Sequence, residues 1–310
     1  MLVSLGGNAI LKHGQKGTVE EQAVNVQNTA KHLAALLRRG ERIAITHGNG
    51  PQVGNILLQN EISKETLPPM PLDVCGAESQ GMIGYMLQRA LRSELDSGGP
   101  KVPVTTIVSQ TLVDSQDPAF KNPTKPVGAF YSAKKAEQLR ESKGWHMISD
   151  SGRGYRRVVP SPTPLDIVEK ETIMRLFETG TVVISVGGGG VPVTREKNGK
   201  LQGVEAVLDK DRTAALLAKT LGVETLLILT DVEKVFINYG KPDQRALERM
   251  TVQECRKYLS EGQFPEGSMG PKVESAVRFL SGSSGRRVVI ASLEMAEEAL
   301  KGTAGTTITN

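Results

Sequence analysis

The chain has 310 residues, of which 38% are hydrophobic and 23% are charged, a balance typical of a globular protein with one large domain or two modest ones. Its 38 Lys and Arg residues are interleaved with 34 Asp and Glu residues, which leaves a formal net charge of +4. No basic block and no basic stripe with aromatic residues is present, so nucleic acid is not expected as a partner.

Cysteine and histidine usage argues against a disulfide framework and against a metal cage. The two cysteines, Cys75 and Cys255, are far apart, and the four histidines show no metal-ligand spacing. No apolar stretch approaches the length of a membrane span, and a glycine turn at Gly6 leaves no room for a signal peptide. We therefore expect a cytoplasmic protein with two buried thiols and no membrane partner.

Three short apolar runs each end at a cluster of glycines. The runs cover residues 2–5, 43–46 and 182–186, and the glycine clusters are Gly6-Gly7-Asn8, Gly48-Asn49-Gly50 and residues 187–190. Such runs predict buried strands of a parallel sheet. Glycines at the carboxyl ends of strands allow close approach of the backbone and expose N–H groups at the edge where open α/β sheets bind ligands. The pattern predicts a site for a small, highly charged anion.

The apolar period becomes helical between these runs. In the first part of the chain it predicts helices over residues 20–39 and 77–95, and a strand over 102–108 in which Pro103 favours an edge or a strand start.

The stretch from about 114 to 160 is polar and rich in proline and glycine, with a short helical piece at 132–142. It has too few apolar residues for a large core of its own. We expect a single domain of residues 1–310 with a small protruding subdomain, 115–158, inserted in it.

Strands and helices alternate again towards the carboxyl end. A hairpin is expected over 191–204 with its turn at Asn198-Gly199, then helices over 211–221, 251–260, 271–281 and 294–301 and strands over 225–230 and 287–291. The order predicts an α/β fold, a three-layer αβα sandwich around a mainly parallel open sheet.

Three lysines stand where loops are expected to meet the sheet edge. Lys210 and Lys272 each open a predicted helix, and Lys125 lies in a turn flanked by prolines. A lysine in the first turn opposes the helix dipole, so these positions favour ammonium groups that face a phosphate together with the helix amides. The alternative is that they are ordinary surface lysines.

Two carboxylates and one amide accompany these lysines. Asp211 would hold the ammonium groups in place, or else only interact with the dipole of its helix. Asp231 would do the same or cap a turn, and its role stays open. Asn49 adds a side-chain amide that can bond an oxyanion, whereas Gly6-Gly7-Asn8 alone could be a tight turn.

Other known motifs fail. No P-loop occurs, the spacing of Gly48, Gly50 and Gly54 does not fit a dinucleotide fingerprint, and no nucleophilic triad stands out. Phosphoryl transfer needs neither a nucleophile nor a metal cage, because positioning and charge neutralisation catalyse it while the nucleotide phosphates hold Mg²⁺.

Over nearly its whole length the chain resembles the carbamate kinases of the amino acid kinase superfamily. The shared segments include 5–9, 46–54, 78–85, 117–120, 122–128, 187–193, 207–211, 228–232 and 267–273. The Asn-Pro-Thr-Lys-Pro segment (122–126) and the Gly-Ser-Met-Gly-Pro-Lys segment (267–272) are the most specific to this family.

The resemblance implies reversible phosphoryl transfer between carbamoyl phosphate and ADP, giving ATP and carbamate, in arginine or related nitrogen catabolism. It implies a homodimer that uses ATP or ADP with Mg²⁺, and no metal ligand among the protein side chains. The implied catalytic residues are Lys125, Lys210, Asp211 and Lys272. The implied substrate-binding residues are Gly6, Gly7, Asn8, Gly48, Asn49, Gly50, Gly188 and Gly189. For residues 187–190, contact with carbamate and simple close packing both stay open.

The adenosine side is expected over the loops 230–240 and 267–272. The nucleotide-binding residues expected there are Thr230, Asp231, Val235, Tyr239, Met269 and Gly270. The alternatives are another small-acid kinase of the same superfamily and a non-catalytic nucleotide-binding regulator. Only five residues precede Gly6, fewer than many family members carry, so we expect a short or trimmed first strand.

Overall fold

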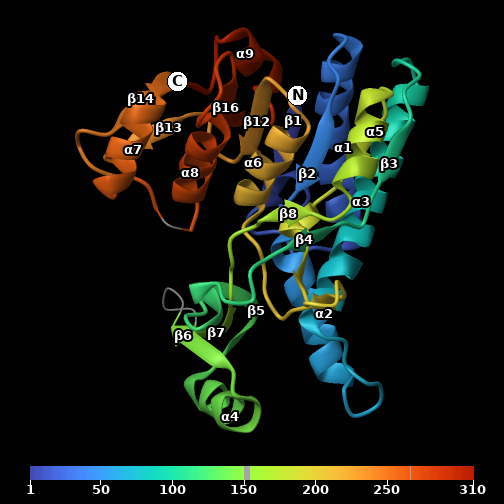
Figure 1. The fold of residues 1–310 in the computed structure, drawn as a ribbon, viewed down its shortest axis with the longest axis vertical. Helices are drawn as coiled ribbons and strands as arrows, with labels where there is room; N and C mark the ends of the chain where they lie inside the picture. Colours follow the sequence, from blue (N-terminus) through green and yellow to red (C-terminus); the bar gives the residue numbers. More distant parts are fainter. Residues whose placement is uncertain (150–153, 266) are drawn as a thin grey trace.

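The computed structural model describes residues 1–149, 154–265 and 267–310. At its centre lies an eight-stranded sheet (Figure 1). Across the sheet the order is β15 (Arg249–Thr251), β17 (Thr306–Thr309), β16 (Arg287–Ser292), β12 (Thr225–Thr230), β1 (Leu2–Leu5), β2 (Ala44–His47), β9 (Val182–Ile184) and β3 (Val104–Thr106). The strands from β16 to β3 run parallel, and β17 pairs antiparallel with β16. The predicted mainly parallel sheet is confirmed, with an antiparallel addition at one edge.

Helices cover both faces of this sheet, which explains why its strands are apolar on both sides. In β1, Leu2 belongs to one core cluster, whereas Val3 and Leu5 belong to the other. The first face is covered by α5 (Lys170–Glu178), α6 (Lys210–Thr220), α7 (Val252–Ser260) and α8 (Met269–Leu280), and the second by α1 (Val19–Arg38), α3 (Leu72–Asp96) and α9 (Ala296–Lys301). The predicted αβα sandwich is confirmed.

Local signals explain where several helices begin. A capping box formed by Thr251 and Glu254 opens α7, and a second one formed by Thr18 and Glu21 opens α1. Helix α2 (Gly50–Ser63), however, is absent from the prediction, because its first turn contains the glycine cluster that was interpreted as a loop. Pro51 in that first turn is the signal for a helix start that could have revealed it.

Smaller sheets surround the main one. The hairpin predicted over 191–204 is formed by β10 (Val191–Arg195) and β11 (Leu201–Gly203). These strands join β4 (Gln110–Leu112) and β8 (Asp166–Ile167) in one sheet, and β13 (Val235–Ile237) pairs with β14 (Arg245–Leu247).

A third small sheet lies at one end of the molecule, away from the main sheet (Figure 1). It consists of β5 (Lys125–Tyr131), β7 (Tyr155–Val159) and β6 (His146–Ser149), with α4 (Ala133–Lys143) against it. Ala136, Leu139 and Met147 form its small core. We name β5, α4, β6 and β7 the arm. The unit predicted over 115–158 stays a prediction, and its residues 150–153 lie outside the described residues.

Two ion pairs and one close backbone contact hold the arm against the body. Lys143 Nζ lies 2.5 Å from Glu61 Oε2 of α2, and Arg157 Nη2 lies 2.6 Å from Glu205 Oε2. A Cβ atom on Gly54 of α2 would lie only 3.1 Å from the Cα atom of Gly128 in β5. Glycine at position 54 therefore allows β5, which begins with Lys125, to lie directly on α2.

In the described part of the chain no helix is both long and apolar enough to cross a membrane. Cys75 and Cys255 are free and buried, as the sequence predicted. Burial raises the pKa of Cys75 to about 11 and that of Cys255 to about 12, so both thiols stay protonated and unreactive at neutral pH.

Two glycines of α3 test how tightly this helix packs on the sheet. A Cβ atom on Gly84 would lie 2.2 Å from Thr106 Cγ2 in β3, whereas one on Gly81 would meet nothing within 4 Å. We expect Gly84→Ala to destabilise the protein by about 1–3 kcal/mol through overpacking. Gly81→Ala should stabilise it by about 0.5–1 kcal/mol, because alanine restricts the unfolded chain. Urea unfolding measures both, and equal effects of the two variants would contradict this packing.

Candidate active site

A cavity of 640 Å³ lies where the carboxyl ends of β1 and β2 meet the first turns of α6 and α8 and the start of β5. The predicted site residues that line it are Gly7, Gly48, Asn49, Gly50, Lys125, Gly188, Lys210, Asp211 and Lys272. Residues far apart in the sequence are thus brought to one edge of the sheet, as the strand pattern predicted.

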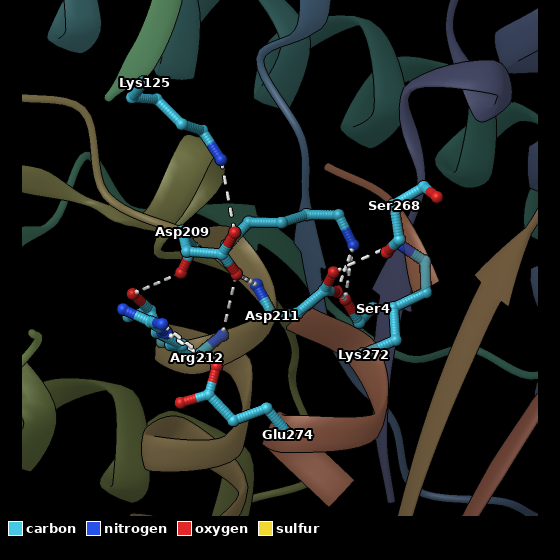
Figure 2. A network of polar contacts seen from close by, with 10 residues as sticks. Ser4, Lys125, Asp209, Asp211, Arg212, Ser268, Lys272 and Glu274 are labelled. Atoms are coloured by element: carbon cyan, nitrogen blue, oxygen red, sulfur yellow. Dashed lines mark hydrogen bonds and ion pairs between the residues drawn. The ribbon is translucent and has the colours of Figure 1, made fainter. Parts of the chain in front are cut away.

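One carboxylate binds two ammonium groups beside this cavity. Lys210 Nζ lies 2.6 Å from Asp211 Oδ1, and Lys272 Nζ lies 3.1 Å from Asp211 Oδ2. Figure 2 shows the Asp211 carboxylate between the two helices, with Ser4 and Ser268 close by. Ser4 Oγ accepts a hydrogen bond from Lys210 Nζ at 3.0 Å, and the Ser268 carbonyl accepts one from Lys272 Nζ at 3.3 Å.

Burial and charge act against each other in this group. Burial alone would raise the pKa of Asp211, but the ammonium groups of Lys210 and Lys272 outweigh it and lower that pKa to about 2. Burial lowers the pKa of Lys210, the Asp211 charge opposes this shift, and the Lys272 charge adds to it. Two positive charges therefore share one negative charge, and the surplus favours an anion in the cavity.

A second ion pair links the arm to α6. Asp209 is the N-cap residue of α6 and accepts hydrogen bonds from the backbone N–H groups of Asp211 and Arg212. Its other carboxylate oxygen lies 3.2 Å from Lys125 Nζ (Figure 2). The same carboxylate thus begins the helix that carries Lys210 and holds the lysine of the arm at the cavity.

Helices α6 and α8 are braced against each other. Arg212 Nη2 of α6 lies 3.0 Å from Glu274 Oε2 of α8, and Arg212 Nε lies 3.2 Å from the same oxygen. Arg212 directly follows Asp211, and Glu274 lies two residues after Lys272, so this pair fixes the distance between the first turns of the two helices.

The glycines at the strand ends allow side chains to pack closely around the cavity. A Cβ atom on Gly188 would lie 2.4 Å from Asn49 Nδ2, and one on Gly187 would lie 2.4 Å from His47 Cε1. Burial lowers the pKa of His47 to about 4, and the nearby charge of Lys210 lowers it further. The hydrogen bond between His47 and the Gly48 carbonyl, at 2.8 Å, acts in the opposite direction and raises this pKa. The imidazole is neutral at physiological pH and fixes the loop after β2.

Three predicted substrate contacts fall outside the main cavity. Gly6 and Asn8 line a neighbouring hollow of 340 Å³. Gly189 is not among the described residues that line either space. Its carbonyl accepts a hydrogen bond from Thr111 Oγ1 at 2.8 Å, and a Cβ atom on it would lie 2.7 Å from Leu208 Cβ. Gly188 therefore lines the cavity, whereas glycine at position 189 allows close packing against Leu208.

A smaller cavity of 230 Å³ adjoins the main one, and Ser268 and Lys272 line both. Its lining includes Thr230, Asp231, Tyr239 and Met269 from the predicted set, together with Phe236, Phe264 and Pro265. A slot lined largely by apolar and aromatic side chains that opens onto a cationic cavity has the form expected of a site for a base and its phosphates.

Two residues predicted as nucleotide contacts do not line this slot. Val235 is fully buried in the core and does not line this slot, because side chains alternate along β13 and Phe236 is the residue that faces it. Gly270 is buried, and a Cβ atom on it would lie 3.1 Å from the Pro265 carbonyl oxygen, so glycine at this position allows close packing.

Sequence reasoning missed Ser4, Asp209 and Phe236 as site residues. Asp209 carries a sequence signal, since an aspartate directly before a helix is a typical N-cap. The alternation of β13 could have separated Phe236 from Val235. Ser4 carries only the weak signal of a hydroxyl in an otherwise apolar strand.

Among the described residues, no group of three or more His, Cys, Asp or Glu side chains could hold a metal ion. Both aspartates of the main cavity already accept hydrogen bonds from lysine ammonium groups.

Comparison with known proteins shows the family of this chain. A model of the amino acid kinase family matches residues 1–292. The carbamate kinase of Pyrococcus horikoshii is 52% identical over 311 residues, which cover 100% of this chain and 98% of that protein. The carbamate kinase of Clostridium perfringens is 47% identical over 99% of both chains.

A solved structure is similar over the same length. The carbamate kinase from Giardia lamblia bound to AMP-PNP superposes with a TM-score of 0.93 at 45% identity, covering 99% of this chain and 97% of that one. The chain therefore belongs to the amino acid kinase family and, within it, to the carbamate kinases, which are phosphotransferases. The family predicted from the sequence is confirmed.

The low pKa of Asp211 makes stability depend on pH. Its folded pKa of about 2 lies below the ordinary value of 3.8, so its charge stabilises the folded state above about pH 4. This contribution, about 2 kcal/mol in total, is lost as the pH falls towards 2. Urea unfolding between about pH 5 and pH 2 should show a steeper loss of stability for the parent than for Asp211→Asn. Parallel curves of stability against pH for the parent and Asp211→Asn would contradict the low pKa of Asp211.

Proposed function

We propose that this protein catalyses reversible phosphoryl transfer between carbamoyl phosphate and ADP, giving ATP and carbamate. The observation that carries the proposal is the Asp211 carboxylate that binds Lys210 and Lys272 at the wall of a 640 Å³ cavity. In a chain about half identical to carbamate kinases over its full length, this arrangement supports their reaction.

In the ATP-forming direction, a terminal oxygen of the ADP β-phosphate attacks the phosphorus of carbamoyl phosphate. The bond from phosphorus to the carbamoyl oxygen breaks, and carbamate leaves with that oxygen and its electron pair. Lys210 and Lys272 donate to the oxygens of the phosphoryl group and stabilise their charge, while Asp211 holds both ammonium groups in place. No side chain has to act as a nucleophile.

Backbone amides and one side-chain amide would bind the small substrate. Gly7, Gly48, Asn49, Gly50 and Gly188 line the cavity, and a glycine backbone can approach the carbamoyl group without a Cβ atom in between. Gly6 and Asn8, which line the neighbouring hollow, would support the loop after β1 that contains Gly7. Lys125 would complete the site from the arm, next to Asp209.

The nucleotide would lie across both cavities. Its base fits the slot between Phe236, Tyr239 and Met269, and its phosphates would pass Ser268 and Lys272 into the main cavity. Thr230 and Asp231 stand at the other side of the slot, where they can bind polar groups of the nucleoside. The AMP-PNP named with the Giardia protein is consistent with such a site.

Mg²⁺ would enter with the nucleotide and be held through phosphate oxygens, since Asp209 and Asp211 are engaged with lysines. When bound, it would neutralise charge on the phosphates of the nucleotide.

We also propose a homodimer. Large apolar side chains are exposed on α3 (Val74, Met82, Tyr85), at the start of β11 (Leu201) and in the segments just before β4 and β8 (Val108, Leu165). Strand β11 lies against α3, because a Cβ atom on Gly203 would lie 1.8 Å from Asp73 Oδ2. Such a patch is typical of a protein interface. The buried thiols agree with a cytoplasmic location, and a place in arginine or related nitrogen catabolism rests on the family resemblance.

A coupled assay tests the reaction directly. With ADP, Mg²⁺ and carbamoyl phosphate, the protein should form ATP, detected through hexokinase and glucose-6-phosphate dehydrogenase. Acetyl phosphate serves as the control donor and should give little ATP. Absence of ATP with carbamoyl phosphate would contradict the proposal and favour another small-acid kinase or a nucleotide-binding regulator.

Removing the lysines separately tests their roles. Lys210→Ala and Lys272→Ala should each lower kcat by about 100-fold or more, because each removes a preorganised donor to the phosphoryl group. Lys125→Ala should lower kcat as well, by about tenfold or more. The matched control is Lys134→Ala, an exposed lysine of α4 on the same arm, whose kcat should stay within about twofold of the parent. Normal turnover in one of these variants would show that the substituted lysine takes no part in the mechanism.

A further inference from the structure

Ser4 is a polar residue at a place where the fold calls for an apolar one. It is fully buried in β1, between Val3 and Leu5, which belong to the core. Because side chains alternate along a strand, Ser4 shares the face of Leu2, which is covered by α6 and α8. Burial of a hydroxyl costs free energy unless it is hydrogen-bonded, so this serine needs partners.

Those partners are the charged groups of the site. Ser4 Oγ accepts a hydrogen bond from Lys210 Nζ at 3.0 Å, and it lies 3.5 Å from Asp211 Oδ1 (Figure 2). Lys210 in turn bonds Asp211 Oδ1 at 2.6 Å. The three groups form a closed triangle whose third corner comes from the first strand of the fold, more than 200 residues away in the sequence.

An ammonium group has three N–H donors. In the described structure, Ser4 and Asp211 accept from Lys210, and the Ser268 carbonyl and Asp211 accept from Lys272. Each lysine therefore has two protein acceptors, and each lines the main cavity with one donor to spare. For Lys210 the second acceptor is a side chain, which can be changed without altering the backbone.

We propose that Ser4 is a positioning residue that holds the Lys210 ammonium group so that its third N–H donor points at the transferred phosphoryl group. This inference rests on the proposed function. Without the Ser4 acceptor, the ammonium group keeps its charge and its bond to Asp211 but is free to rotate about that bond. The loss should then appear in the chemical step, where orientation counts, and not in nucleotide binding, because Ser4 does not line the slot proposed for the base.

The test compares three variants by steady-state ATP formation from ADP and carbamoyl phosphate, with melting temperature as a check on folding. Ser4→Ala should lower kcat about tenfold, as expected for one lost hydrogen bond to a charged group, with the KM for ADP within about twofold of the parent. Ser4→Thr keeps the hydroxyl and should retain clearly more turnover than Ser4→Ala. The control is Ser185→Ala, which removes a buried hydroxyl that has no hydrogen-bond partner among the described residues and should leave kcat unchanged.

Each outcome decides the matter. A folded Ser4→Ala variant with parental kcat would overturn the inference while leaving the proposed function intact. Equal losses of kcat in Ser4→Ala and in a folded Ser4→Thr, or in Ser4→Ala and Ser185→Ala, would also overturn it, because the hydroxyl at position 4 would then not be the cause. A parent that forms no ATP would contradict the proposed function and this inference together.

Discussion

The site depends on one buried carboxylate that two ammonium groups share. Asp211 has only 5% of its side chain exposed, and Lys210 and Lys272 have 14% and 12%. A buried ion pair is costly when either partner is missing, and this group is left with one positive charge in excess. The fold tolerates the excess because the ammonium groups face a cavity, where a phosphoryl group can supply the missing negative charge.

Much of the surrounding architecture serves to bring these three side chains together. Asp209 begins α6 so that Lys210 and Asp211 fall in its first turn, and the Arg212–Glu274 pair fixes α8 beside it. Strand β1 packs against α6 and contributes Ser4. The arm, held on α2 by the Gly54–Gly128 contact and by Lys143, brings Lys125 to Asp209 from the other side of the cavity.

The sequence predicted the sheet, most covering helices and the lysine cluster, because each has a local signal. Apolar runs that end in glycines mark buried strands, and lysines in first helical turns are conspicuous against the helix dipole. The predictions that the structure does not match have local causes too. Glycines in the first turn of α2 conceal its helical pattern, and the alternation of β13 turns Phe236, not the predicted Val235, to the slot.

Other features had no local signal. The antiparallel strand β17 follows a short helix at the end of the chain, and only its pairing with β16 and β15 reveals its place. The contacts of Ser4 join positions 4 and 210, and those of Lys125 join positions 125 and 209. Such pairs depend on how the elements pack, which the pattern of a single sequence does not contain.

The central claim is that Lys210 and Lys272, held by Asp211, bind the phosphoryl group in transfer. A crystal structure with ADP, Mg²⁺ and an aluminium fluoride mimic of that group tests it most directly. We expect fluoride atoms within about 3 Å of both Nζ atoms, with Asp211 still bridging the two lysines. A mimic bound away from either lysine, or an Asp211 carboxylate turned out of the pair, would contradict it.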